Sequence, residues 1–393
     1  MTDDAIPNCV PCLPGDERDY LVECIQSGWV SSVGPFVDRF ERMFADYHRV
    51  PGAVAAASGT AAIHLGLLAV GVKPGDLVIC PTMTFIGTVN PIRYCGADPL
   101  FIDAESNTLN LDLATLRDRL EHETERTTAG LVHKPTGRRI AAMVVVHLFG
   151  NPVDMDAAMA IAGRHGLPVV EDAAESLGAR IGDRLVGTIG DVGCFSFNGN
   201  KVITTGGGGM VISNDAARLR RCKHLSTQAR SDAFEFVHDD VGYNYRMTNL
   251  AAALGVAQFQ HLEEFIERKR AHAEAYQSAL GVDAGWQIVR EPSGTRGTYW
   301  MILARRRTAN GPLVPVLKEL AASGIGVRPV WRPLHRLPIF SGCPCWGSEV
   351  ADELYRTVCC LPSSVGLTPP QIERVTRALR ATTGLVGAVA AER

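Results

Sequence analysis

One lysine near the middle of the chain follows a short apolar segment and a polar turn. The segment reads Phe195-Ser196-Phe197-Asn198-Gly199-Asn200-Lys201, and four glycines follow at 206–209. A lysine held between tight turns in a crevice loses hydration, which lowers the pKa of its amine, and a neutral amine forms imines with carbonyl compounds. Lys201 is therefore a candidate catalytic residue. A solvated turn lysine is the alternative, because the glycine run lacks the spacing of a P-loop.

A second segment has the features of a phosphate site. Small residues at 53–57 predict a strand that leads into Ser58-Gly59-Thr60-Ala61-Ala62, and a helix is expected to begin near Thr60. Free N–H groups and the positive end of the helix dipole attract an anion there. Gly59 lets the backbone approach it, and Thr60 adds a hydroxyl group. An ordinary helix N-cap is the alternative.

A third segment, 168–172, ends a predicted strand with Glu171 and Asp172. The carboxyl ends of parallel strands open onto the ligand crevice of an α/β domain. A carboxylate there can keep a pyridine nitrogen protonated, which makes the ring an electron sink, although Asp172 could instead cap the next helix. A phosphate cup, an acid and a reactive lysine in this order point to one common cofactor, pyridoxal 5'-phosphate (PLP).

The chain resembles the DegT/DnrJ/EryC1/StrS sugar aminotransferases, which are PLP enzymes of fold type I. The matching segments cover nearly the whole chain and are residues 28–34, 58–62, 171–176, 196–209, 242–247 and 328–331. The sequence of residues 196–210 and 224–229 looks most like that of the LegC-type nucleotide-sugar 4-aminotransferases.

The resemblance implies a role for each matching residue. Lys201 would carry the cofactor as a Schiff base and move protons during catalysis, and Phe85 would stack on the ring. Asp172 would face the ring nitrogen, and Glu175 would lie near the ring hydroxyl. The cofactor phosphate would be held by Gly59, Thr60, Ser196 and, from the neighbouring subunit, Asn244.

The resemblance also implies the reaction and the assembly. L-glutamate would donate its amino group to C4 of a UDP- or GDP-linked 4-keto-6-deoxy (N-acetylamino) sugar, in a homodimer with shared sites. Relatives that act as dehydratases carry histidine in place of the lysine, so Lys201 favours transamination, and a 3-aminotransferase is a further alternative. Glu175 departs from the Gln or His of many relatives, which leaves its role open because two anions repel unless they share a proton.

Four other residues are candidate substrate contacts on the same resemblance. They are Trp29 and Ser31 in the N-terminal segment, and Trp331 and His335 near the C-terminal end. Tryptophan in an apolar neighbourhood is more often core packing, and a lone histidine is more often structural, so each residue has a purely structural alternative.

The elements that position these residues alternate between short apolar runs and amphipathic stretches. Strands are predicted at 77–80, 99–103, 142–148 and 168–172, and helices at 113–120 and 157–165. This alternation predicts a large α/β domain with a mainly parallel sheet over residues 1–250. Residues 250–280 predict one long charged helix, which opens a smaller C-terminal α+β domain over 251–393. Residues 121–137 are expected to form an inserted polar loop.

Composition narrows the function classes. The net charge of -3 offers no general attraction for nucleic acid or an anionic membrane. The acidic N-terminus and the lack of a long apolar run predict a cytoplasmic protein without membrane spans. The 11 cysteines lack paired metal spacing, so reduced thiols and no metal site are expected.

Two other classes compete with an aminotransferase. Alternating strands and helices also build NAD-dependent oxidoreductases, but no Gly-x-Gly-x-x-Gly turn follows the first strand. A non-catalytic sensor can use the same fold, since fold does not fix function. The presence of both Lys201 and Asp172 argues against a sensor.

Overall fold

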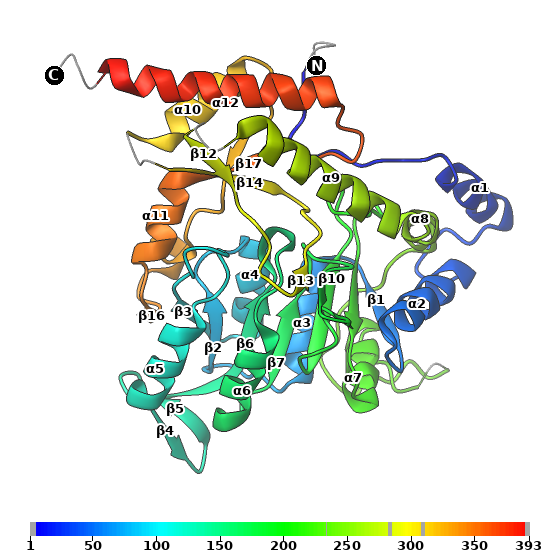
Figure 1. Cartoon of the computed structure of the whole chain (residues 1–393). Coiled ribbons are helices and arrows are strands. Elements are labelled where there is room, and N and C mark those ends of the chain that lie inside the picture. The colour runs from blue at the N-terminus through cyan, green and yellow to red at the C-terminus, as the bar shows by residue number, and fades with distance from the viewer. Residues whose placement is uncertain (1–4, 233, 282–284, 308–310, 390–393) are drawn as a thin grey trace.

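A mainly parallel β-sheet runs through the larger part of the molecule (Figure 1). The computed structural model describes residues 5–232, 234–281, 285–307 and 311–389, with the backbone alone from 383 onward. Strand β11 is antiparallel to both of its neighbours, β1 and β10, and the other neighbouring strands of the series are parallel. In spatial order the strands are β1 (Ala53–Ala56), β11 (Gly209–Ile212), β10 (Val192–Ser196), β7 (Val169–Asp172), β6 (Arg138–Val146), β2 (Leu77–Pro81), β3 (Asp98–Ile102) and β16 (Cys345–Trp346).

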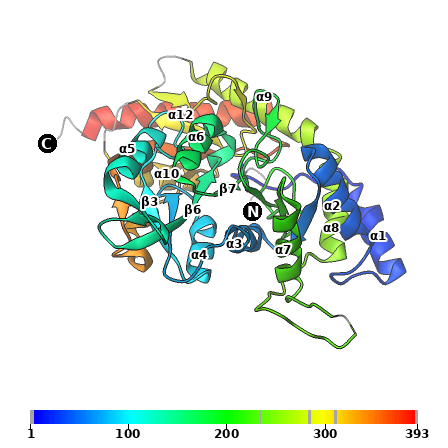
Figure 2. The same ribbon diagram turned by 90° about the horizontal axis from the view of Figure 1, so that it is seen from below.

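Helices cover both faces of this sheet (Figure 2). Successive side chains of a strand point to opposite faces, so Leu77 and Ile79 of β2 belong to one core, and Val78 and Cys80 to another. The first core includes residues of α5 (Leu113–Glu123) and α6 (Met155–His165). The second includes residues of α3 (Gly59–Ala69), α4 (Ile86–Tyr94) and α7 (Ala216–Ser226). Burial on both faces explains why these strands read as continuous apolar runs.

A separate hydrophobic core lies in the C-terminal part of the chain, around Tyr276, Trp286 and Leu361. It forms between helices and a four-stranded sheet, as predicted for a smaller α+β unit, although the boundary at residue 250 stays a prediction. The sheet comprises β12 (Trp286–Ile288), β14 (Ile302–Arg306), β17 (Val358–Leu361) and β15 (Arg328–Pro329). The helices of this part are α9 (Leu262–Leu280), α10 (Leu313–Ala322), α11 (Glu349–Thr357) and α12 (Pro369–Val389).

The remaining elements are short or lie at the N-terminus. Helices α1 (Glu17–Ser27) and α2 (Pro35–His48) both pack against α8 (Asn249–Phe259). A small sheet comprises β13 (Thr295–Arg296), β8 (Arg180–Ile181) and β9 (Arg184–Leu185), and the 3-10 turns are η1 (Leu148–Gly150), η2 (Leu334–Arg336) and η3 (Pro338–Phe340).

Two predicted elements were wrong. The single helix over 250–280 is two helices, because α8 ends at Phe259 and α9 begins at Leu262. The chain changes direction there since α8 packs on α1 and α2, whereas α9 packs on α12. The expected loop at 121–137 instead contains the hairpin of β4 (Thr124–Thr127) and β5 (Gly130–His133), which pairs with β6 and buries Leu131 and Val132.

The absences expected from the sequence concern membranes, leader peptides and metals. No helix of the described ranges has the length and apolar character needed to cross a bilayer. Residues 1–4, which form the acidic N-terminus, lie outside the described residues. Where the structure describes side chains, no group of three or more His, Cys, Asp or Glu could hold a metal ion.

Candidate active site

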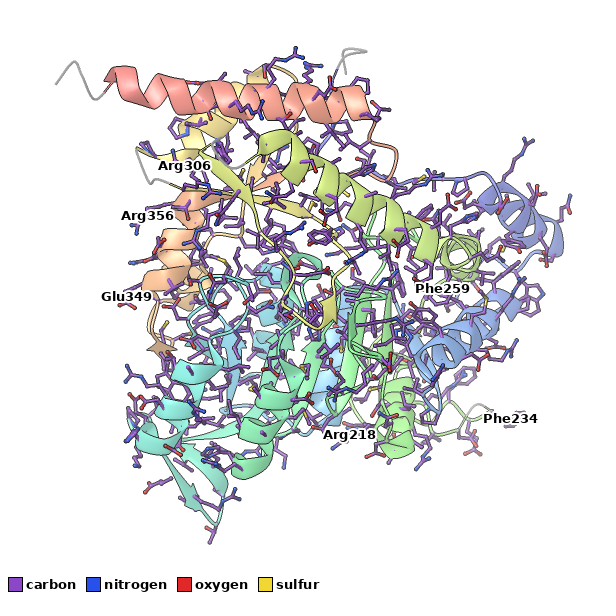
Figure 3. The ribbon with its side chains drawn as sticks, viewed as in Figure 1. Arg218, Phe234, Phe259, Arg306, Glu349 and Arg356 are labelled. Atoms are coloured by element: carbon purple, nitrogen blue, oxygen red, sulfur yellow. The ribbon has the colours of Figure 1, made fainter. Side chains whose placement is uncertain are left out.

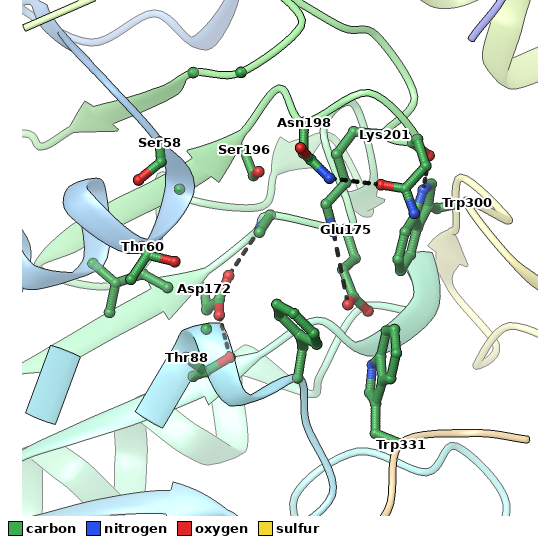
Figure 4. A pocket seen from close by; sticks show the side chains of 18 residues that line it. Ser58, Thr60, Thr88, Asp172, Glu175, Ser196, Asn198, Lys201, Trp300 and Trp331 are labelled. Atoms are coloured by element: carbon green, nitrogen blue, oxygen red, sulfur yellow. Dashed lines mark hydrogen bonds and ion pairs between the residues drawn. The ribbon is translucent and has the colours of Figure 1, made fainter. Parts of the chain in front are cut away.

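A pocket of about 320 Å³ lies where the carboxyl ends of β7 and β10 meet the N-terminus of α3 (Figure 4). This edge of a parallel sheet is the usual place for a ligand crevice. The pocket is lined by Ser58, Gly59, Thr60, Ile63, Phe85, Gly87, Thr88, Asp172, Ala174, Glu175, Ser196, Asn198, Asn200, Lys201, Gly207, Gly208, Trp300 and Trp331. The structure therefore brings together all three segments singled out in the sequence.

Lys201 projects into the pocket from the turn that follows β10. Its Nζ lies 3.8 Å from Oε1 of Glu175 and 3.8 Å from the ring centroid of Trp300. Burial lowers the pKa of the Lys201 amine, and the carboxylates of Glu175 and Asp172 partly oppose that effect. A lysine with a lowered pKa holds more of the neutral, nucleophilic amine at neutral pH.

Asp172 ends β7 and is buried. Its Oδ2 accepts a hydrogen bond from Oγ1 of Thr88 at 2.7 Å, and its Oδ1 accepts one from the backbone N–H of Ala174 at 3.0 Å. Burial raises the pKa of Asp172, while these two bonds and nearby Lys201 lower it. The sequence offered two alternatives for Asp172, a ligand-facing residue or a cap of the next segment. In the structure Asp172 both lines the pocket and accepts the N–H of Ala174.

Glu175 is buried beside Lys201 and accepts the backbone N–H of Phe149 at 2.6 Å. Burial raises the pKa of Glu175 to about 7, and Asp172 adds to the rise. This raised pKa lets the carboxyl group carry a proton near neutral pH and share it with an anion. Phe149 adopts φ 56°, a left-handed conformation that is unfavourable for a bulky side chain and directs its N–H toward Glu175.

The start of α3 lines the pocket at the place where the sequence predicted a phosphate cup. Oγ of Ser58 caps the helix by accepting the N–H of Ala61 at 3.1 Å, and Gly59 and Thr60 line the pocket with Ser196. A Cβ added at Gly59 would lie 2.6 Å from Cβ of Ser196, so only glycine fits between the cup and β10. A cup for an anion, an acid beyond it and a lysine beside both fit PLP.

Not every residue singled out in the sequence lies in this pocket. Phe85 and Trp331 line it, with ring centroids 5.1 Å apart. His335 lies outside the lining, where its Nδ1 is 2.6 Å from Oγ1 of Thr82. Trp29, Ser31 and Asn244 are also outside the lining and are exposed in this single chain.

Sequence reasoning missed several residues of the pocket, including Thr88, Asn198, Asn200 and Trp300. Asn198 and Asn200 both lie just before Lys201 in the sequence and could have been proposed from that proximity alone. Thr88 and Trp300 carry no local signal, since each reaches the pocket only through the tertiary fold.

Comparison with known proteins adds a family to this geometry. The sequence model of the DegT/DnrJ/EryC1/StrS aminotransferase family matches residues 11–380. GDP-perosamine synthase from Escherichia coli O157:H7 is 39% identical over 336 residues, covering 86% of this chain and 87% of that protein. GDP-perosamine synthase from Caulobacter vibrioides is 37% identical over 372 residues, covering 94% and 96%.

The fold is also shared with solved structures. The aminotransferase TlmJ from Streptoalloteichus hindustanus superposes with a TM-score of 0.87 at 28% identity, covering 97% of this chain and 100% of that one. The predicted fold class, a mainly parallel α/β sheet of the PLP-dependent aminotransferase type, is therefore confirmed.

Proposed function

The chain belongs to the DegT/DnrJ/EryC1/StrS aminotransferase family, and we propose that it moves an amino group from L-glutamate to C4 of a nucleotide-linked 4-keto-6-deoxy sugar. It is a PLP-dependent sugar-nucleotide aminotransferase. The observation that carries the substrate proposal is the identity of 37–39% to two GDP-perosamine synthases. A GDP-linked keto sugar is therefore the first substrate to test, and a UDP-linked N-acetylamino keto sugar is the second, because of the LegC-type resemblance.

The pocket residues divide into those that hold the cofactor and one that moves protons. When bound, PLP supplies a carbonyl that combines with amines and a ring that withdraws electrons from the bond being broken. Gly59, Thr60 and Ser196 would hold the phosphate, and Asp172 would face the ring nitrogen. Phe85 would cover the ring, and Glu175 would share a proton with the ring hydroxyl.

Lys201 is the proposed acid and base. A base must lie within about 3 Å of the proton that it moves, and an amine tethered beside the cofactor meets that requirement in both half-reactions. The lowered pKa of Lys201 supports this role, because the neutral amine accepts a proton and the resulting ammonium group returns it. Glu175, 3.8 Å away, is the nearest carboxyl partner for that ammonium group.

A homodimer is part of the proposal. Residues 230–232 and 234–241 belong to a segment that projects beyond α7 (Figure 2), and Phe234 in it is 91% exposed (Figure 3). Exposed aromatic side chains on a projecting segment favour contact with another protein surface. We assign that surface to a second copy, whose cofactor phosphate Asn244 would reach and whose substrate Trp29 and Ser31 would contact. A cytoplasmic location is also proposed, since all 11 cysteines are free thiols.

The test is incubation with glutamate and a panel of GDP- and UDP-linked 4-keto and 3-keto sugars, with mass detection of the aminated product. Amination of a 4-keto sugar supports the proposal, and amination of 3-keto sugars alone contradicts it. Borohydride reduction of the PLP-loaded protein, followed by peptide mapping, should place the cofactor on Lys201. A label on another lysine would overturn that assignment.

A further inference from the structure

Trp300 lies against the reactive amine of Lys201. It belongs to the segment just before β14, is 1% exposed and lines the pocket. The Lys201 Nζ lies 3.8 Å from the centroid of its ring. The face of a tryptophan ring carries negative electrostatic potential and attracts an ammonium group most strongly where water is excluded. The other pocket tryptophan, Trp331, packs on Phe85 and Phe149.

Polar contacts fix Trp300 at both ends. Its indole Nε1 donates to the carbonyl oxygen of Asn200 at 2.5 Å, and Asn200 directly precedes Lys201. Its own carbonyl oxygen accepts a hydrogen bond from Nζ of Lys269 at 3.2 Å. The ring is thus tied to the lysine turn on one side and to α9 on the other.

Lys269 is itself unusual, because its side chain is 1% exposed and its partners are neutral. Its Nζ donates to the carbonyl oxygen of Ser363 at 2.5 Å and faces Sγ of Cys9 at 3.8 Å. Among the described residues no Asp or Glu forms an ion pair with it. A buried cation is costly without such contacts, so this geometry fixes the Lys269 side chain against the Trp300 backbone.

We propose that Trp300 is a catalytic residue whose ring face stabilises the ammonium form of Lys201 after the amine has taken up a proton, and that Lys269 positions the ring. The proposal rests on the proposed role of Lys201. The proton that the amine accepts is then held on Nζ, which lies 3.8 Å from the Trp300 ring centroid and 3.8 Å from Oε1 of Glu175.

The other groups that face Nζ define when the ring matters. Glu175 lies 3.8 Å away, and Asp172 and Cys9 also favour the charged amine, while burial opposes it. Because the pKa of Glu175 is about 7, this carboxyl group loses its charge as the pH falls below neutrality. The Trp300 ring does not titrate, so its interaction with the ammonium group is the same below that pH as above it.

The test measures the ionisation of Lys201 without the cofactor. Cofactor-free protein is labelled with an amine-reactive anhydride over a range of pH, and the Lys201 peptide is quantified by mass spectrometry. The midpoint of labelling against pH reports the pKa of the amine and is not moved by access to the pocket. Trp300→Leu should lower that midpoint by about one unit, a tenfold change in the neutral fraction, and Trp300→Phe should lower it less.

Phe85→Leu is the matched control, because Phe85 is an aromatic residue of the same pocket lining, whereas the Lys201 amine lies over the ring of Trp300, so the midpoint should stay unchanged. An unchanged midpoint in folded Trp300→Leu would overturn the proposal. Lys269→Met should shift the midpoint in the same direction as Trp300→Leu, and Lys269→Arg should restore it. A folded Lys269→Met protein with the wild-type midpoint would refute the positioning role. Because no cofactor is present, these results are independent of the borohydride test.

Discussion

The pocket around Lys201 and the exposed surface that carries Trp29, Ser31 and Asn244 differ in how far their residues are buried and hydrogen-bonded within the chain. In the pocket, Lys201, Asp172 and Glu175 are closely packed, and each carboxylate accepts a backbone or side-chain hydrogen bond within the chain. On the surface, the three candidate residues are exposed and outside any such network with the pocket. The residues proposed for catalysis therefore lie together within one chain, whereas the roles proposed for Trp29, Ser31 and Asn244 depend on the proposed second copy.

The largest effect is expected from the centre of the pocket. Lys201→Ala should reduce turnover by about 10⁴-fold, because it removes the group that transfers protons. PLP binding should survive, since Gly59, Thr60, Ser196 and Asp172 are unchanged. Steady-state kinetics and cofactor absorbance after dialysis measure the two properties. Near-normal turnover would contradict the proposed mechanism.

A smaller loss is expected at the acid. Asp172→Asn should reduce turnover by about 10³-fold while weakening cofactor binding much less, because an amide does not stabilise a protonated pyridine nitrogen as a carboxylate does. Single-turnover rates of both half-reactions provide the measurement. Thr88→Val, which removes the hydroxyl group that donates to Asp172 and also contacts Oγ1 of Thr84, is the matched control and should reduce turnover less. If Asp172→Asn keeps both rates, another group faces the ring nitrogen.

Mixing two weakly active homodimers tests the exposed region directly. A hybrid of Asn244→Ala and Lys201→Ala subunits has one site with both defects and one with neither, if Asn244 serves the partner's cofactor. Activity should then recover to about a quarter of the wild-type value in a random equal mixture, because half of the dimers are hybrids with one intact site. Native mass spectrometry confirms hybrid formation. Hybrids without activity would place Asn244 in its own subunit's site or outside the site.

The smallest effect concerns stability and pH in the cofactor-free protein. The pKa of Glu175 rises from its usual 4.5 to about 7 on folding, mainly through burial. The folded protein therefore keeps a proton that the unfolded chain has released, and this contribution to stability is present below pH 4.5 and lost as the pH rises through 7. Relative to Glu175→Gln, the wild type should lose about 3 kcal/mol of unfolding free energy across that range. Urea denaturation at several pH values measures the unfolding free energy of both proteins. If the two free energies changed with pH in the same way, the shifted pKa of Glu175 would be contradicted.

Most of the parallel sheet could be predicted because its strands are buried on both faces and read as apolar runs. The strand predicted at 168–172 is β7, and the helix expected near Thr60 is α3. The break between α8 and α9 could not be foreseen, since residues 250–280 keep helical composition throughout, and the change of direction is imposed by packing against α1, α2 and α12. The hairpin at 124–133 was missed because its first strand, Thr124–Thr127, is polar and mostly exposed, as in a loop.

The residues of the candidate site that lie near the ends of predicted strands and helices could be predicted from the sequence. Asp172 ends β7, Gly59 begins α3 and Lys201 lies in the turn after β10, so their positions follow from the topology of the sheet. Trp300 and Lys269 escaped because their contacts with the lysine turn connect segments that are distant in sequence. His335 was expected near the substrate, but its contact with Thr82 places it outside the pocket lining in this chain.

The two edges of the sheet have a consequence for the time at which the protein folds. One edge strand, β1, begins at Ala53, and the opposite edge strand, β16, ends at Trp346. Strand β1 hydrogen-bonds to β11, whose residues leave the ribosome more than a hundred positions later. Pairings so distant in sequence form slowly, because the chain must close long loops before the contacts stabilise it. The N-terminus of α3 therefore meets β10 and β11 late, and the sheet is completed only after Trp346 has been synthesised.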